Sequence, residues 1–289
     1  GQLGLHRGRE SFDQLGGLAA GRILAETCMA GLGQVAIVPG NANVWVGPAI
    51  QVTTDHPVAA CMASQYAGWP VQTESFFAMG SGPMRAARGC EPLFDDIGRL
   101  EQADAIAGVL ESDILPPPEA CHLIADECGV APENLTLLVA PTTSLAGTIQ
   151  VVARSIETAL HKMYELKYDV ARVASGFGIA PLPPVAADNL TGIGRTNDAI
   201  LYGGEVTLWI DDEDARLQEL GSKIPSVASA DHGEPFSAVF EKYDRDFYKI
   251  DPLLFSPAVV TLVNVGTGRS YRFGETRPDV LSKSFKLSS

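Results

Sequence analysis

Positive charge, charged residues in general and long apolar runs are all scarce in this sequence. Lysine and arginine together number 21 against 35 aspartate and glutamate residues, so the net charge of the 289-residue chain is −14. So acidic a chain is a poor binder of nucleic-acid phosphates and of anionic membrane surfaces, because both attract cations. The apolar runs all fall well short of the ~20 residues that a membrane-spanning helix needs. We therefore expect neither a nucleic-acid-binding protein nor a membrane protein.

Paired cysteine motifs are also absent. The sequence contains five cysteines, an odd number, at wide spacings and without a Cys-x-x-Cys pair. Cys121 and Cys128 lie seven residues apart, which is not the spacing of zinc ligands, so no metal site is predicted. Reduced, mostly buried thiols are typical of a cytoplasmic protein. The first residues have no apolar core like that of a signal peptide, which agrees with a cytoplasmic location.

Helices and strands are expected to alternate along the chain. Strands are predicted at residues 35–38, 44–54, 69–79 and 135–140, and helices at residues 17–32 and 117–129. The clearest helix spans residues 147–167, where apolar residues recur at helical spacing. Residues 199–210 are expected to form two strands interrupted at Gly203 and Gly204. This order predicts an α/β protein of two domains, residues 1–138 and 139–289, which can interleave.

Two glycine motifs and one acidic run have simple structural explanations. GLGQVA (31–36) has the glycines of a dinucleotide fingerprint, but a helix precedes it and a strand follows, the reverse of the required order. GSGPM (80–84) lacks the Lys-Ser/Thr of a phosphate-binding loop. Its backbone N–H groups could still bind an anion, but a tight turn is the simpler explanation. DDED (211–214) is typical of a solvated helix N-terminus.

Three segments place polar residues inside apolar runs, where burial without partners is costly. They are TDHPVAACMASQYAGW (54–69), FFAMGSGPMRA (76–86) and APTTSLAGTIQVVARSIETALHKM (140–163). Two further segments, IGRTNDAILYGG (193–204) and DFYKIDPLLFSPA (246–258), are equally idiosyncratic. On these five segments, the chain resembles the methenyltetrahydromethanopterin cyclohydrolase family from about Gly16 to the C-terminus.

The resemblance implies a fold, an assembly and a reaction. The family has two α/β domains with a substrate pocket between them, forms a homotrimer and uses neither a metal nor a redox cofactor. Water adds to the methenyl carbon that bridges two nitrogens of the pterin substrate, and one C–N bond opens to leave the N5-formyl compound. Family members carry a longer stretch ahead of the segment at Gly16, so a truncated chain or a trimmed first domain is expected.

The resemblance also implies site residues. The family places an arginine and a glutamate three residues apart at the catalytic water, and these match Arg154 and Glu157. A short segment that lines the same site matches Gln65, Tyr66 and Ala67. Family members can carry lysine at the middle position, where this chain has Tyr66, so a cation is not predicted there.

The residues themselves support this chemistry. Arg154 and Glu157 are three positions apart on the clearest helix and share a face. A surface ion pair worth about 0.3–0.5 kcal/mol is the simple alternative, but the pair lies in the apolar half of the helix. Glu157 can act as a general base towards water, with its pKa raised by burial and lowered by Arg154. Arg154 can act as a fixed donor to the water or to the forming oxygen.

Weaker candidates complete the predicted site. Ser81 and Gly82 are candidates for lining the pocket. Arg195 and Asp198 are three residues apart, like Arg154 and Glu157, and are the second candidate for the catalytic pair. They are expected in a glycine-bounded segment rather than in a long helix. Two other functions stay open, namely a pterin-binding protein without catalysis and a cyclohydrolase that acts on a folate-type analogue.

Overall fold

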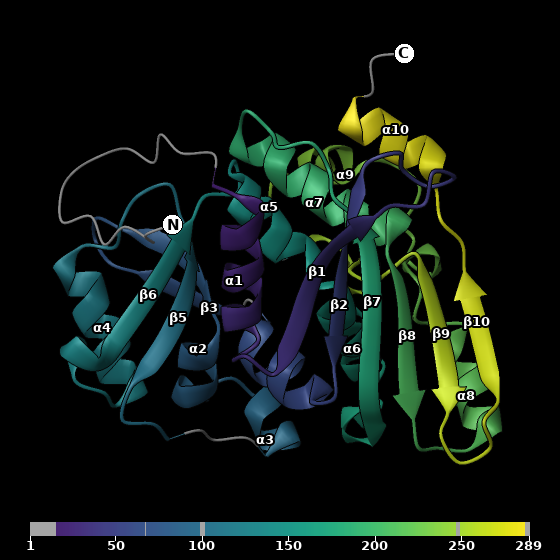
Figure 1. Cartoon of the computed structure of the whole chain (residues 1–289), viewed down its shortest axis with the longest axis horizontal. Coiled ribbons are helices and arrows are strands. Elements are labelled where there is room, and N and C mark those ends of the chain that lie inside the picture. Colours follow the sequence, from purple (N-terminus) through teal and green to yellow (C-terminus); the bar gives the residue numbers. More distant parts are fainter. Residues whose placement is uncertain (1–15, 67, 99–101, 247–248, 287–289) are drawn as a thin grey trace.

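The computed structural model describes residues 16–66, 68–98, 102–246 and 249–286. Their strands form two separate sheets, a six-stranded one and a four-stranded one. Figure 1 shows the smaller sheet on the left and the larger sheet on the right, with helix α1 (Leu18–Cys28) between them. The prediction of a mixed α/β protein is therefore confirmed.

The larger sheet follows the order β1-β2-β7-β8-β9-β10. Its strands are β1 (Gly33–Pro39), β2 (Pro48–Thr54), β7 (Val173–Pro181), β8 (Glu205–Ile210), β9 (Val259–Asn264) and β10 (Ser270–Gly274). All neighbours are antiparallel except β8 and β9, which run parallel. The strand β8 is buried at Val206, Leu208 and Ile210 and more exposed at the residues between them, so one face carries the core.

The smaller sheet follows the order β3-β4-β5-β6. Its strands are β3 (Trp69–Gln72), β4 (Phe77–Ser81), β5 (Ile106–Glu111) and β6 (Leu135–Ala140). Only β5 and β6 are parallel, and helix α4 (Pro118–Cys128) connects them. Such a strand-helix-strand unit places the ends of β5 and β6 at one edge of the sheet.

Helices cover both sheets and the region between them. The remaining α-helices are α2 (Pro83–Arg88), α3 (Leu93–Ile97), α5 (Leu145–Val152), α6 (Ser155–Glu165), α7 (Asn189–Gly203), α8 (Asp214–Gly221), α9 (Phe236–Lys242) and α10 (Pro278–Phe285). A π-helix, η1 (Val58–Gln65), and four short 3₁₀ segments, η2 (Pro132–Asn134), η3 (Val170–Arg172), η4 (Ser226–Ala228) and η6 (Pro252–Leu254), complete the set within the described residues. Every described helix is too short or too polar to cross a bilayer.

The two sheets interleave along the chain. Strands β1 and β2 precede the smaller sheet in sequence and pair with each other, and β2 also pairs with β7, which follows the smaller sheet. The predicted boundary between residues 138 and 139 stays a prediction, and it falls within β6. The chain thus starts the larger sheet, builds the smaller one and then returns.

Residues 147–167 are not one helix, as the sequence predicts, but parts of two. Helix α5 ends at Val152 and α6 begins at Ser155. Between them the N–H of Arg154 bonds to the carbonyl oxygen of Val151, three residues back, instead of that of Gln150. Within the same break, the carbonyl oxygen of Ala153 accepts from the Gln65 amide nitrogen at 3.1 Å. The break is therefore held by a residue far away in the sequence.

The prediction of a strand before Gly203 is wrong, because residues 199–203 complete helix α7. The Asp188 side chain caps the start of this helix by accepting from the N–H of Thr191. Ala199, Leu201 and Tyr202 are all buried, because α7 packs against α5, α9 and α10 as well as β7. A short run that is buried on all sides shows no helical period, which explains why the pattern resembled a strand.

Helix α6 lies unusually close to β7, and glycine makes this approach possible. A Cβ atom added at Gly178 would lie 2.3 Å from the Ser155 Oγ and 3.0 Å from a side-chain carbon of Ile156. Both of these residues are fully buried in the first turn of α6. The contact therefore sets the depth at which the start of α6 rests on the larger sheet.

We expect Gly178→Ala to lower the free energy of unfolding by about 1–3 kcal/mol, because the methyl group overpacks this contact. Urea denaturation followed by circular dichroism measures the change. Ala174→Ser adds one heavy atom at an exposed position of the same strand and serves as the control. Equal effects of the two substitutions would contradict the close contact.

Candidate active site

The two main candidates, Arg154 and Glu157, lie at the start of α6, where it faces the smaller sheet. Arg154 is the N-cap residue of α6, and Glu157 is in its first turn. The two residues are 8% and 4% exposed, so the surface ion pair considered from the sequence is excluded. Within the described residues, they make no ion pair with each other within 4 Å, and Arg154 has other partners.

The Arg154 guanidinium connects α6 to the edge of the smaller sheet. One terminal nitrogen lies 3.6 Å from a carboxylate oxygen of Glu111, the last residue of β5. The same nitrogen donates to the hydroxyl oxygen of Ser81, the last residue of β4, at 3.4 Å. Burial disfavours the charge of Arg154, but the negative charges of Glu111 and other nearby groups outweigh this effect and raise its pKa. The guanidinium therefore stays charged and fixed.

A hydrogen-bonded chain extends from Arg154 through Ser81 to a buried thiol. The Cys28 Sγ lies 3.1 Å from the Ser81 Oγ and accepts from the Gln150 amide nitrogen at 3.4 Å. Because Arg154 can only donate to Ser81, the hydroxyl proton of Ser81 is free to point at Cys28. The thiol has the carbonyl oxygen of Gln65 as its own acceptor, at 3.9 Å. Each member of this chain supports the position of the next.

The Glu157 carboxylate is buried without the usual compensation. Within the described residues it makes no hydrogen bond and no ion pair within 4 Å. Burial raises its pKa from 4.5 to about 7, and the positive charges of Arg154 and Arg85 partly oppose this rise. A carboxyl group with a pKa near the working pH is half ionised there, which is the condition for efficient general-base catalysis. Perturbed carboxyl groups of this kind are concentrated at functional sites.

The segment at Gln65 and Tyr66 approaches α6 from η1. Gln65 is fully buried and donates to the carbonyl oxygen of Ala153, next to Arg154. The Tyr66 ring stacks on His161 of α6, with 4.9 Å between ring centres and 19° between planes. Burial and the charge of Glu157 raise the pKa of Tyr66 to about 12, so its hydroxyl stays neutral. Ala67, the third predicted residue of this segment, lies outside the described residues.

Ser81 joins the site, whereas Gly82 has a structural role. Gly82 adopts a φ of 91° as the residue before α2, a conformation that favours glycine. Its N–H donates to the carbonyl oxygen of Ser64 at 2.8 Å. The amide of Gly82 is therefore not available to an anion, and the expectation that Gly82 lines the pocket stays a prediction.

The structure does not bring Arg195 and Asp198 to this place. Both are on α7, so the prediction that they lie outside a long helix is wrong. Arg195 donates to the carbonyl oxygens of Pro184, Val185 and Ser284. Asp198 accepts from the N–H of Phe236 at the start of α9, and burial raises its pKa to about 7. These contacts fasten α7 to its neighbours.

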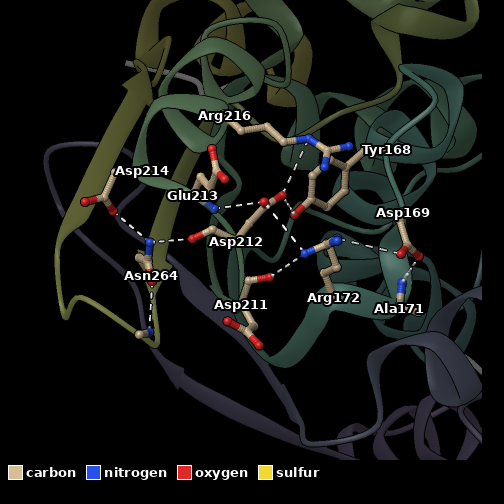
Figure 2. Close-up of polar contacts among 11 residues, drawn as sticks. Tyr168, Asp169, Ala171, Arg172, Asp211, Asp212, Glu213, Asp214, Arg216 and Asn264 are labelled. Carbon is tan, nitrogen blue, oxygen red and sulfur yellow. Dashed lines mark hydrogen bonds and ion pairs between the residues drawn. The ribbon is translucent and has the colours of Figure 1, made fainter.

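The acidic run at residues 211–214 is another polar cluster, and Figure 2 shows the contacts of the Asp212 and Asp214 side chains within it. The Asp212 side chain is only 4% exposed and forms ion pairs with Arg172 and Arg216 at 3.7 and 3.6 Å. It also accepts from the Tyr168 hydroxyl at 2.8 Å. The expectation of a solvated face is thus wrong for Asp212, which ties the segment after β8 to the segment just before β7. Within the described residues, no group of acids, histidines and cysteines is arranged to hold a metal ion.

A cavity of about 630 Å³ lies elsewhere, at the far end of α6. Its polar lining includes His56, Asp96, Tyr164, Lys167 and Asp169. None of the predicted site residues lines it. The cavity is therefore distinct from the cluster around Arg154.

Sequence reasoning missed several members of the cluster. Glu111, Cys28 and Gln150 all lie close to Arg154 or to its partner Ser81. The position of Glu111 at the end of an apolar strand was a usable signal, because strand ends collect functional side chains. Cys28 and Gln150 have no comparable signal, since each is a single polar residue on a buried helix face.

The fold and the cluster together define a class of protein. It is a two-sheet α/β protein with a buried arginine and a carboxyl group that titrates near neutrality, an arrangement suited to proton transfer on a small molecule. The chain matches the family model described as Cyclohydrolase (MCH) over residues 11–285, and it belongs to this family. The resemblance noted from the five sequence segments is thereby confirmed.

Known relatives agree with this membership. A methenyltetrahydromethanopterin cyclohydrolase of Rhodopirellula baltica is 52% identical over 277 residues, which cover 94% of this chain and 83% of the relative. The enzyme of the same name from Xanthobacter autotrophicus is 47% identical over 93% of this chain and 80% of its own length. That of Methanococcoides burtonii is 40% identical over 95% and 86%, respectively.

The raised pKa of Glu157 predicts a dependence of stability on pH. Below about pH 4.5 the group is protonated in both states and costs nothing; between about pH 4.5 and 7 only the unfolded state ionises, so stability is lost as the pH rises. We therefore expect Glu157→Gln to be more stable than the wild type at pH 8, by roughly 2–3 kcal/mol, and equally stable below about pH 4.5.

Chemical denaturation at several pH values checks this expectation. Glu133→Gln, at an exposed position, is the control and should show no such trend. A difference between the Glu157 variant and the wild type that stays constant with pH would show that the carboxyl group is not desolvated.

Proposed function

We propose that this protein hydrolyses N5,N10-methenyl-tetrahydromethanopterin, reversibly, to the N5-formyl compound. The names of the relatives support the substrate and the reaction. The single structural observation that carries the mechanism is the buried Glu157, with a pKa of about 7, at the start of the helix that Arg154 caps. A base that is ionised near neutral pH is what the attack of water requires.

In the proposed mechanism, water attacks the methenyl carbon while Glu157 takes one of its protons. The water oxygen forms a bond to carbon, and the cationic substrate becomes a neutral hydroxyl adduct. Glu157 then returns its proton to the departing nitrogen, the C–N bond breaks, and the hydroxyl group loses its proton as the formyl carbonyl forms. The reaction releases one proton overall, which balances the positive charge of the substrate.

Arg154 is proposed to orient the water and the forming carbonyl oxygen. Its contacts with Ser81 and Glu111 fix the guanidinium before substrate arrives, so little reorganisation is needed. The substrate carbon belongs to a cation and is already electrophilic. The mechanism therefore relies on positioning and one base, and it includes no metal and no cofactor.

Gln65, Tyr66 and Ala67 are proposed to line the substrate pocket between the two sheets, together with Ser81. Gln65 is suited to this role because its amide oxygen is buried and has no partner within the described residues. The neutral hydroxyl of Tyr66 offers a donor and an acceptor at the same edge.

We also propose a homotrimer in the cytoplasm. The family resemblance supports the trimer. All five cysteines are unpaired, which is the state that a reducing compartment maintains.

The rate of the reaction tests the role of Glu157. We expect Glu157→Gln to lower kcat by roughly 10²–10⁴-fold with substrate affinity nearly unchanged, because the amide cannot accept the proton. Loss of the methenyl absorbance measures the rate, and Glu133→Gln is the matched control.

Three outcomes separate the alternatives. An equal rate in the wild type and the Glu157 variant would reject Glu157 as the base. Binding without turnover by the wild type would indicate a pterin-binding protein. Faster turnover of the folate analogue would correct the substrate.

Sedimentation equilibrium tests the assembly. We expect a mass of about three times the 30.6 kDa of one chain, independent of protein concentration over the micromolar range. A mass equal to one chain would contradict the trimer without affecting the proposed reaction.

A further inference from the structure

Arg85 is a fully buried charge that the mechanism above does not use. It lies on the short helix α2, beside the smaller sheet, and the residue is 0% exposed. A buried guanidinium is costly unless its donors are satisfied. Its Nε donates to Glu91 at 2.8 Å, and a terminal nitrogen donates to the other oxygen of the same carboxylate. The remaining terminal nitrogen is directed elsewhere.

That nitrogen donates to the last turn of η1. Its acceptors are the carbonyl oxygens of Met62 and Ala63, the latter at 2.9 Å. Carbonyl groups at a helix end lack partners within the helix, so a fixed cation there holds the end in place. Gln65 and Tyr66 follow within three residues. Arg85 therefore holds the segment that carries them.

The same guanidinium supports Tyr66 directly. Its central carbon lies 4.7 Å from the centre of the Tyr66 ring, and this ring in turn stacks on His161. His161 is four residues after Glu157 on α6, so it lies on the same side of the helix. A continuous column thus runs from α2 through η1 to the helix that carries the base.

Arg85 also acts on Glu157 through its charge. Four ionisable groups interact with the Glu157 carboxyl group, namely Arg154 at the start of its helix, Arg85 from α2, and Tyr66 and Cys61 from η1. Burial raises the Glu157 pKa, and Arg154 and Arg85 are the two positive charges that lower it. Arg85 is thus the second source of positive charge at the base, and it comes from the opposite side of the junction.

We propose that Arg85 is a positioning residue for the reaction, because it holds the end of η1 and the Tyr66 ring against α6. Its fixed positive charge is a second part of this role, since it acts on the Glu157 carboxyl group. This role rests on the proposed function, because it is defined by what Gln65, Tyr66 and Glu157 do there. Arg85 lies behind Tyr66 and touches no reacting atom.

Two substitutions separate the two parts of this role. Arg85→Lys keeps the charge but loses the planar guanidinium, whose N–H groups bond Glu91 and the two η1 carbonyls at the same time. We expect its kcat to fall at least tenfold, because the lining segment shifts, while the acid limb of the pH profile of kcat/KM stays in place. Arg85→Gln removes the charge, so the Glu157 pKa rises and the acid limb moves to higher pH by on the order of one unit.

Arg88 provides a matched control on the same helix. It also pairs with a glutamate, Glu127, and its guanidinium also lies over an aromatic ring, that of Trp69, at 4.6 Å. Its side chain is 24% exposed, and its contacts are away from η1. Arg88→Lys and Arg88→Gln should leave both kcat and the acid limb unchanged.

A second readout needs no substrate. Glu157→Gln is introduced into the wild-type and the Arg85→Gln backgrounds, and its stabilising effect is measured against pH in each. The stabilisation grows with pH over the range in which Glu157 is ionised only in the unfolded state. It levels off once the pH passes the pKa of Glu157 in the folded state. We expect the plateau to begin at a higher pH in the Arg85→Gln background, by the same amount as the acid limb moves. A protein that only lost packing would not show this displacement.

The outcomes distinguish this inference from the proposed function. A displaced plateau in a protein without cyclohydrolase activity would reject the proposed function and keep the electrostatic role of Arg85. An active protein in which Arg85→Gln displaces neither the plateau nor the acid limb, and Arg85→Lys retains kcat, would overturn the inference. If Arg85→Gln fails to fold, the kcat of folded Arg85→Lys against Arg88→Lys still decides the positioning role, and equal values reject it.

Discussion

The junction between the two sheets depends on charge that is kept out of water. Arg154 is buried at the start of α6, which packs on the larger sheet. Its partners Ser81 and Glu111 belong to the smaller sheet. A guanidinium in such a place is stable only with its partners present, because an unpaired buried charge costs several kcal/mol. The ends of β4 and β5 and the start of α6 are therefore held together by one residue.

The same constraint gives Glu157 its unusual chemistry. Its carboxyl group shares the buried region but has no hydrogen-bonding partner among the described residues, so burial outweighs the nearby positive charges and raises the pKa to about 7. The contrast between an arginine with partners and a carboxyl group with none among the described residues follows from their positions. Arg154 reaches the end of the smaller sheet, whereas Glu157, one turn later, does not.

The sequence contained enough information to predict several strands and the α/β class, and it singled out Arg154 and Glu157, which the structure shows to be buried. It did not predict that α5 and α6 are separate, because the apolar spacing continues through Ala153 and Arg154. The break is stabilised by Gln65, 88 residues earlier, and by partners on the smaller sheet. Residues 199–203 show the same limit of local sequence patterns. They are buried on all sides of α7, so their sequence does not alternate between apolar and polar residues at helical spacing. Local patterns identified these elements only where one face was exposed.

The interleaving of the two sheets has a consequence for the order of folding. The strands of the smaller sheet come from one continuous stretch, Trp69 to Ala140, so they can find each other by local search. The pairing of β2 with β7 instead joins Thr54 to Gly176, and the loop between them contains that entire unit. Closing a long loop costs entropy before its contacts form, which makes such non-local pairing slow. The larger sheet is thus expected to complete late. Prior folding of the smaller sheet shortens the effective loop between β2 and β7.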